Sequence, residues 1–174
     1  MNNFAAIDLK SLAFLVYNTL KEHGIEAILV GGACVSIYSE NRYQSYDLDF
    51  ATFEDLKKVE KPLQTLGFKR AGRSFRHENC PYFIDFVNPP IAIGNESIRT
   101  FQTLTSKCGM LKLLTPTDCV KDRLAAYFYW DDPQSLEQAR LVAKHHTIDS
   151  NNLTSWAQNE GFLAKLQLFF DSLK

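Results

Sequence analysis

The chain has 174 residues, of which 45% are hydrophobic and 22% are charged, and its formal net charge at pH 7 is −1. A chain of this length and composition can bury a core without disulfide or metal staples, as one domain of ordinary size. The balanced charge excludes attraction to nucleic acid through bulk charge. No stretch approaches the roughly 18 consecutive apolar residues of a membrane span, and the start lacks the pattern of a secretion signal. We therefore expect a cytoplasmic protein that does not contact membranes.

The cysteines are scattered along the chain and form no C-x-x-C pair: Cys34, Cys80, Cys108 and Cys119. This spacing does not match a zinc site, and a disulfide framework is unusual at this chain length without a secretion signal. We therefore expect four small side chains that are buried or half-buried.

Helix and strand patterns alternate through the first part of the chain. Apolar residues on one helical stripe predict a helix over 9–23, with Asp8 as its N-cap and Gly24 just beyond its end. The apolar run 26–30 predicts a short buried strand that ends at a pair of glycines. The elements expected next are a short helix over 33–40, a strand over 47–52, a helix over 53–67 that is irregular at Pro62, and strand structure over 68–77.

Aromatic and β-branched residues predict another strand over 82–87. The proline-containing segment 88–97 predicts a turn-rich connection, and 97–114 predicts one or two strands around a turn at Gly109. Thr-Pro-Thr-Asp at 115–118 is a strong helix start, with a capping threonine and proline at the first helical position. Helical patterns then cover 115–130, 134–146, 151–160 and 162–173. We expect an α/β core over residues 1–114 and a helical region over 115–174 docked on it.

Two aspartates interrupt the apolar pattern of the strand over 47–52. Because residues i and i+2 of a strand point to the same face, Asp47 and Asp49 project together, about 6.5 to 7 Å apart. Adjacent carboxylates repel each other, so solvent, basic side chains or divalent cations must offset the repulsion. Asp85 stands in the middle of the strand over 82–87, where an isolated acid is costly. If the two strands are neighbours, the three carboxylates form a site for two Mg²⁺ ions, with Mn²⁺ as the alternative.

Gly31 and Gly32 stand between the first strand and the short helix. Glycines at such a turn let backbone amides approach a phosphate closely, and the helix directs its positive N-terminus toward it. Each motif alone has a simpler interpretation: the glycines as a tight turn, the aspartates as strand-edge or capping residues. The order of the motifs, glycine pair, D-x-D and then a lone aspartate, favours a metal and phosphate site.

This order resembles the nucleotidyltransferase superfamily, the fold of DNA polymerase β. The family pattern is a hydrophobic residue, two small residues, a spacer, D-h-[DE]-h and a distant third acid. It is matched by Val30, Gly31, Gly32, Asp47, Leu48, Asp49, Phe50 and Asp85. The chain is most similar to small stand-alone bacterial members, including those of type IV toxin–antitoxin and abortive-infection systems.

The resemblance implies an α+β fold, in which a nucleotidyltransferase-like mixed β-sheet is flanked by helices and followed by a C-terminal helical bundle. It implies an enzyme that moves a nucleoside monophosphate from a nucleoside triphosphate, such as ATP, to a hydroxyl. Asp47 and Asp49 would ligate both metal ions, and Asp85 would ligate one and serve as the base. Gly31 and Gly32 would hold the triphosphate.

Three further residues are candidates for nucleotide binding. Arg42 and Ser45 stand in places similar to the arginine and the serine or threonine that precede the D-x-D motif in these bacterial members. Related enzymes often place a lysine on the helix over 115–130 against the triphosphate, and Lys121 is the candidate here. The alternative for Lys121 is a surface lysine that pairs with Asp118 or Asp122 by helical spacing.

The acceptor is open among a protein side chain, the 3′ end of an RNA and a small molecule. Seven basic residues between Lys57 and Arg76 are the candidate RNA contact. The alternative function is a catalytically inactive nucleotide- or partner-binding module, including one half of a toxin–antitoxin pair. Exposed aromatic residues at 127–130 would then anchor the partner, and otherwise they pack between the two halves. A metal-dependent nuclease or phosphatase explains the glycine pair less well.

Overall fold

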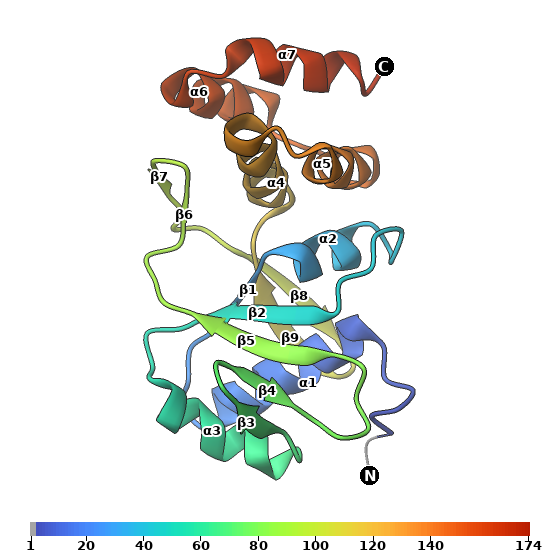
Figure 1. The fold of residues 1–174 in the computed structure, drawn as a ribbon, viewed down its shortest axis with the longest axis vertical. Helices are drawn as coiled ribbons and strands as arrows, with labels where there is room; N and C mark the ends of the chain where they lie inside the picture. The colour runs from blue at the N-terminus through green and yellow to red at the C-terminus, as the bar shows by residue number, and fades with distance from the viewer. Residues whose placement is uncertain (1–2) are drawn as a thin grey trace.

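The computed structural model describes residues 3–174, so the expected core over 1–114 begins two residues outside the described part. Its centre is a seven-stranded mixed sheet with the strand order β3-β4-β5-β2-β1-β9-β8 (Figure 1). The strands are β1 Ile28–Val30, β2 Asp47–Ala51, β3 Lys69–Ala71, β4 Ser74–Arg76, β5 Phe83–Val87, β8 Gln102–Ser106 and β9 Gly109–Leu113. A separate two-stranded hairpin consists of β6 Ala92–Ile93 and β7 Glu96–Ser97.

The sheet has two parallel and four antiparallel neighbour pairs. β1 lies antiparallel to β2 and parallel to β9, and β2 lies parallel to β5. The outer pairs β3–β4, β4–β5 and β8–β9 are antiparallel. The expected α+β fold with a mixed sheet is therefore confirmed.

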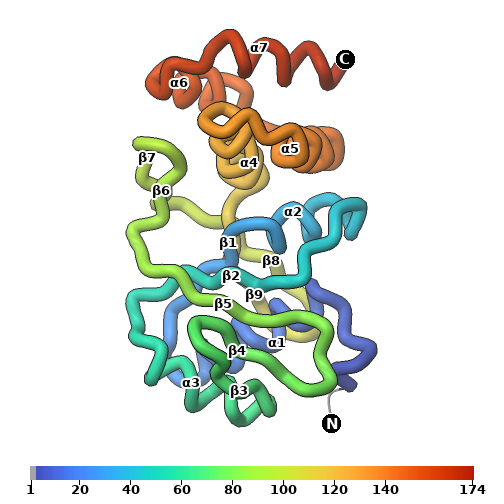
Figure 2. Tube along the Cα trace, viewed as in Figure 1, coloured from blue at the N-terminus to red at the C-terminus, as the bar shows by residue number. Residues whose placement is uncertain are grey.

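The described residues form seven helices. They are α1 Leu9–Glu22, α2 Gly32–Tyr38, α3 Leu56–Thr65, α4 Pro116–Trp130, α5 Pro133–His145, α6 Ser150–Glu160 and α7 Leu163–Asp171. The last four gather at the end of the molecule away from the N-terminus, with α2 between them and the sheet (Figures 1 and 2). No helix in residues 3–174 has the length and apolar character needed to cross a membrane. The division of the chain at residue 114 stays a prediction.

The helices α1 and α4 begin at capping residues that can be recognised in the sequence. Asp8 caps α1 by accepting a hydrogen bond from the Ser11 amide at 2.9 Å. Thr115 caps α4, where its hydroxyl accepts from the Asp118 amide at 3.1 Å and proline follows at the first helical position. Pro62 lies inside α3, in the last turn and a half before the helix ends at Thr65. The predicted caps of α1 and α4 are confirmed, whereas α3 begins three residues later and ends two residues earlier than the predicted 53–67.

One element was not expected from the sequence. The segment 88–97 contains the β6–β7 hairpin, which turns at Gly94 (φ +61°) and Asn95. The Glu160 carboxylate, at the end of α6, accepts hydrogen bonds from the Asn95 amide at 2.7 Å and from its side chain at 3.1 Å. The indole of Trp156 donates to the Ile93 carbonyl at 3.2 Å. Contacts from more than sixty residues away thus hold this hairpin.

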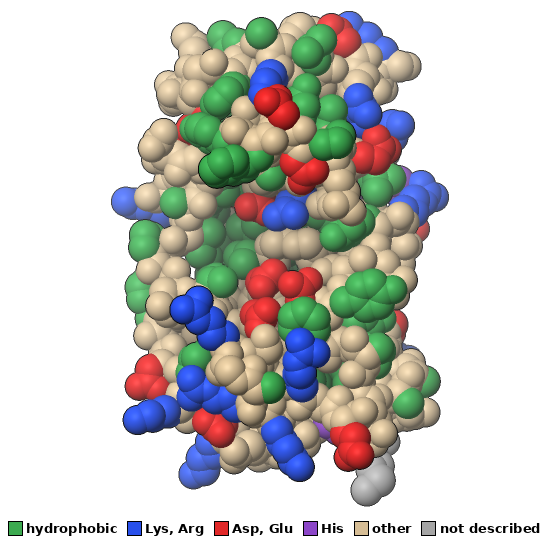
Figure 3. All heavy atoms as spheres, in the orientation of Figure 1, with side chains coloured by type: hydrophobic (Ala, Val, Ile, Leu, Met, Phe, Trp, Pro, Cys, Tyr) green, Lys and Arg blue, Asp and Glu red, His purple; other side chains and the backbone are tan. Residues whose placement is uncertain are grey.

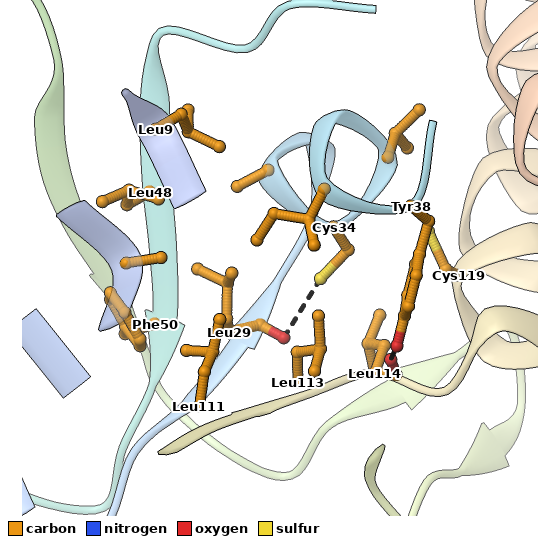
Figure 4. Close-up of a cluster of buried hydrophobic side chains, with 14 of the residues drawn as sticks. Leu9, Leu29, Cys34, Tyr38, Leu48, Phe50, Leu111, Leu113, Leu114 and Cys119 are labelled. Carbon is orange, nitrogen blue, oxygen red and sulfur yellow. Dashed lines mark hydrogen bonds between the residues drawn. The ribbon is translucent and has the colours of Figure 1, made fainter. Parts of the chain in front are cut away.

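The main core fills the space between the sheet, α1 and α2, and it continues to the start of α4 (Figure 4). Leu48 and Phe50 of β2 are fully buried in it. Tyr38, at the end of α2, donates its hydroxyl hydrogen to the Leu114 carbonyl at 2.5 Å, and Cys119 lies beside it (Figure 4). The Tyr38 carbonyl in turn contacts His146 Nε2 at 2.8 Å. Tyr38 therefore joins α2 to both ends of the α4–α5 pair.

The four cysteines are all free. Cys34 and Cys119 are buried and Cys80 is half-buried, as expected, but Cys108 is exposed. The prediction is wrong for Cys108 because this residue lies in the tight turn between β8 and β9, which projects from the sheet edge.

The aromatic residues at 127–130 do not pack between the sheet and the helices. Phe128 is buried and stacks on Trp156 and Phe162, with ring centroids 5.4 and 5.2 Å apart. Trp130 is 82% exposed, since α4 ends there. The expectation of packing between the two halves is wrong, because α6 and α7 cover this side of α4 themselves.

Candidate active site

Three carboxylates converge where β2 and β5 lie side by side. The register places Asp49 directly opposite Asp85, and Asp47 lies two residues before Asp49 on the same face of the sheet. One ligand oxygen from each of the three lies within 4.8 Å of the others. Figure 3 shows acidic side chains gathered at the centre of the visible face, over β2 and β5. The condition set for a three-carboxylate site, that the two aspartate-bearing strands are neighbours, is therefore met.

Repulsion among the three carboxylates, together with burial, makes the fully ionised cluster unfavourable. Burial raises the pKa of Asp49 to about 6, and the charges of Asp47 and Asp85 add to the increase. The guanidinium of Arg123 opposes this effect. Asp85 Oδ1 is buried and has no hydrogen-bond partner within residues 3–174. A buried carboxylate oxygen without a partner lowers the stability of the fold by about 1–3 kcal/mol or more. A cation bound at this site would offset that loss.

The donor set fits a divalent metal ion. Mg²⁺ is held in proteins by a few carboxylate oxygens, and its remaining ligands are water and substrate phosphates. A cation among Asp47, Asp49 and Asp85 would offset their repulsion and give Asp85 Oδ1 the partner that the chain does not supply. The three residues are therefore suited to hold a metal ion.

Gly31 lies against the cluster, and no other residue type fits there. Its backbone has φ +71° and ψ −153°, which is a glycine conformation. A Cβ atom at this position would lie 2.7 Å from Asp49 Oδ2. A Cβ on Gly32 would lie 3.3 Å from Ser45 Oγ. The glycine pair thus lets the end of β1 approach the carboxylates closely, beside the face where a phosphate would lie.

Ser45 contacts the cluster as well. Its side chain is buried, and its hydroxyl donates to Asp47 Oδ1 at 2.7 Å. The Ser45 amide donates to Ser36 Oγ in α2 at 2.8 Å. The structure therefore brings Ser45 to the carboxylates, where it orients Asp47.

The structure does not bring the two predicted cations to the carboxylates. Arg42 is exposed, and its guanidinium hydrogen-bonds His145 Nε2 on α5. Lys121 is buried, and its ammonium lies 2.9 Å from Glu96 Oε1 and 3.5 Å from Asp118 Oδ1. It lines a cavity of about 380 Å³ whose walls do not include the three aspartates. The pairing with Asp118 matches the alternative that helical spacing predicts for Lys121, although this lysine is not a surface residue.

A different cation of α4 acts on the cluster. Arg123 is half-buried, pairs with Asp122, and donates to Gln138 Oε1 at 3.2 Å. Burial lowers the pKa of this guanidinium, but the Asp122 carboxylate and other neighbouring groups together raise it above its ordinary value. Its positive charge favours the ionised form of Asp49. Sequence alone does not distinguish Arg123 from Lys121, because the choice depends on which side of α4 faces the sheet.

No family model matches the sequence, and neither does any curated protein. Several solved structures are similar to this chain. One is an antigenic nucleotidyltransferase-like protein from Paracoccidioides brasiliensis, with 16% identity and a TM-score of 0.56 over 78% of this chain and 73% of that one. The chain has the nucleotidyltransferase fold. Another similar structure is ANT(2″)-Ia in complex with adenylyl-2″-tobramycin, with 12% identity and a TM-score of 0.51 over 94% of this chain and 99% of that one.

Proposed function

We propose that the protein is a metal-dependent nucleotidyltransferase, which moves a nucleoside monophosphate from a nucleoside triphosphate to a hydroxyl. The observation that carries the proposal is the convergence of Asp47, Asp49 and Asp85 beside Gly31 on this fold. Three carboxylates without a protein cation among them lower the stability of the fold. A role in phosphoryl transfer on bound metal ions would explain why the chain keeps such a destabilising cluster.

In this proposal each residue has a separate role. Bound Mg²⁺ or Mn²⁺ would neutralise the triphosphate and stabilise the charge that develops on it. Asp85 accepts the proton of the attacking hydroxyl, and Ser45 holds Asp47 in its ligating orientation. The hydroxyl oxygen forms a bond to the α-phosphorus, the bond from that phosphorus to the bridging oxygen breaks, and pyrophosphate leaves. Gly31 and Gly32 present backbone amides to the phosphates without a side chain in the way.

The two cations predicted from the sequence differ in how freely they can contact the triphosphate. Arg42 is exposed and pairs with a histidine that a phosphate can displace, so it remains a candidate contact to the triphosphate. Lys121 already has two carboxylate partners and is a weaker candidate. Arg123 is the cation that acts on Asp49, and we add it to the nucleotide contacts.

The acceptor remains open among a small molecule, an RNA 3′ end and a protein side chain. The adenylyl-2″-tobramycin bound to ANT(2″)-Ia is an adenylylated small molecule, which favours the first class for a chain of the same fold. ATP as the donor and a partner in a toxin–antitoxin pair stay predictions from the sequence resemblance.

Label transfer tests the proposal. The purified protein is incubated with Mg²⁺ or Mn²⁺ and each α-labelled nucleoside triphosphate, together with total RNA and a cell lysate. Wild type should transfer label, and Asp47→Asn and Asp49→Asn should not. A nucleotide-binding titration on the same samples separates an inactive binding module, which binds nucleotide with metal but transfers nothing, from a live enzyme. Absence of both binding and transfer would refute the proposal.

A further inference from the structure

A second cavity, of about 390 Å³, lies at the ends of β1 and β2. We call it the apolar pocket, because most of its lining residues are hydrophobic, among them Ile28, Ala51, Phe53, Ile91, Ile98 and Phe101. Its volume is in the range of small-molecule sites, which are mostly apolar with a few polar groups. Figure 3 shows hydrophobic side chains in the recess beside the central acidic group.

Strand register connects the apolar pocket to the carboxylates. Ala51 lies two residues after Asp49 on β2, so both point to the same face, about 6.5 to 7 Å apart. On β1, Val30 pairs with Asp49 and Ile28 pairs with Ala51. The floor of the apolar pocket therefore continues the face that carries the candidate metal site, one pair of residues further along both strands.

The apolar pocket and the glycine pair lie on opposite sides of the carboxylates. Along β1, Gly31 follows Val30, whereas Ile28 precedes it. Transfer of a phosphoryl group requires the attacking and leaving oxygens to lie roughly in line. If the leaving pyrophosphate is held at the Gly31 end, the attacking hydroxyl must enter from the Ile28 end. This geometry assigns the apolar pocket to the acceptor rather than to the nucleobase.

The charges in the apolar pocket limit the acceptor further. Its charged lining residues are Arg99, Lys112 and Glu26. The ion pairs found in residues 3–174 involve neither Arg99 nor Lys112. The two cations outnumber the single carboxylate of Glu26, which is in none of these ion pairs either, so the lining has a net positive charge. Such a lining favours a ligand that is itself apolar and negatively charged. A polycationic acceptor such as an aminoglycoside would meet like charges here.

We infer that the apolar pocket is the acceptor subsite and takes a small aromatic anion that carries a hydroxyl group. This inference rests on the proposed function. The acceptor hydroxyl oxygen bonds to the α-phosphorus, its proton passes to Asp85, and pyrophosphate leaves from the Gly31 side. Arg99 and Lys112 bind the negative charge at the far end of the acceptor.

Two phenols that differ in charge test the inference. The ¹⁵N-labelled full chain, in millimolar Mg²⁺ without nucleotide, is titrated with 3-(4-hydroxyphenyl)propionate or with tyramine and followed by NMR. The propionate should shift the amides of Ile28, Ala51 and Ile98, and should bind about five-fold tighter than tyramine, the effect of one ion pair. Arg99→Glu should remove or reverse this preference. Arg73→Glu, the same change at an exposed arginine outside the apolar pocket, should keep it.

The outcomes separate this inference from the proposed function. Shifts at other amides, equal binding of the two phenols, or no binding would overturn the acceptor assignment, even if label transfer to RNA or protein succeeds. Displacement of the propionate by the nucleotide would overturn it too, because the nucleobase would then occupy the apolar pocket. Selective propionate binding with neither nucleotide binding nor label transfer would keep the anion site and refute the proposed function.

Discussion

Replacing Asp49 by asparagine should stabilise the metal-free protein and remove its response to Mg²⁺. The substitution keeps the shape of the side chain but removes one of three converging charges. Burial and the neighbouring Asp47 and Asp85 raise the pKa of Asp49 from 3.8 to about 6. The ionised cluster thus lowers the free energy of unfolding at neutral pH, and the same charges create a site that a cation can occupy.

The direction and the size of the stability change caused by Asp49→Asn follow from proton linkage. The folded chain keeps the Asp49 proton up to about pH 6, whereas the unfolded chain releases it near pH 4, so stability falls as the pH rises between these values. The full displacement corresponds to about 3 kcal/mol. Because Asp49 is partly exposed and therefore screened by solvent, we expect about 1–2 kcal/mol. For a chain of this size that is a gain of about 3–6 °C in Tm for Asp49→Asn at about pH 8, and almost none at about pH 3.5.

Thermal unfolding at the two pH values, with and without Mg²⁺, is the assay. Mg²⁺ should raise the Tm of the wild type, since it binds the folded state, and should raise that of Asp49→Asn much less. Glu78→Gln is the matched control, because it removes one exposed carboxylate away from the cluster and should change stability by less than about 0.5 kcal/mol. Equal stability of Asp49→Asn and wild type at about pH 8, or an equal gain at both pH values, would refute the reasoning.

Three other substitutions test the site and its surroundings. Gly31→Ala should lose about 1–3 kcal/mol of unfolding free energy and should also lose Mg²⁺ binding. Gly161→Ala, which is also at positive φ but in open space, should lose stability alone. Unfolding with and without metal measures both effects. Ser45→Ala should weaken Mg²⁺ about ten-fold in a calorimetric titration, because Asp47 loses its orienting hydrogen bond; unchanged affinity would contradict that role. Lys121→Met should lose about 1–3 kcal/mol in denaturant unfolding, because buried Asp118 loses its ammonium partner and keeps only the Thr115 hydroxyl. Lys58→Met, at an exposed pair, should lose under about 1 kcal/mol.

Features that depend on neighbouring residues could be predicted from the sequence. The alternation in β2 places Asp47 and Asp49 on one face and the buried Leu48 and Phe50 on the other, because the side-chain period of any strand is two. The start of α4 is equally local, since Thr115 caps a helix whose next residue is proline. The order of the glycine pair and the acids was sufficient to predict the fold, because that order matches the motif pattern of the superfamily that the chain resembles.

Features that join distant parts of the chain depended on the tertiary structure. Asp85 lies opposite Asp49 only because β5 pairs with β2 in that register, and the sequence does not specify which strands pair. The β6–β7 hairpin depends on Glu160, which follows it by more than sixty residues. Lys121 and Arg123 stand two positions apart on α4, so packing alone turns one toward Glu96 and brings the charge of the other to the carboxylates. Local periodicity orients a side chain relative to its own element, and only packing between elements decides what it meets.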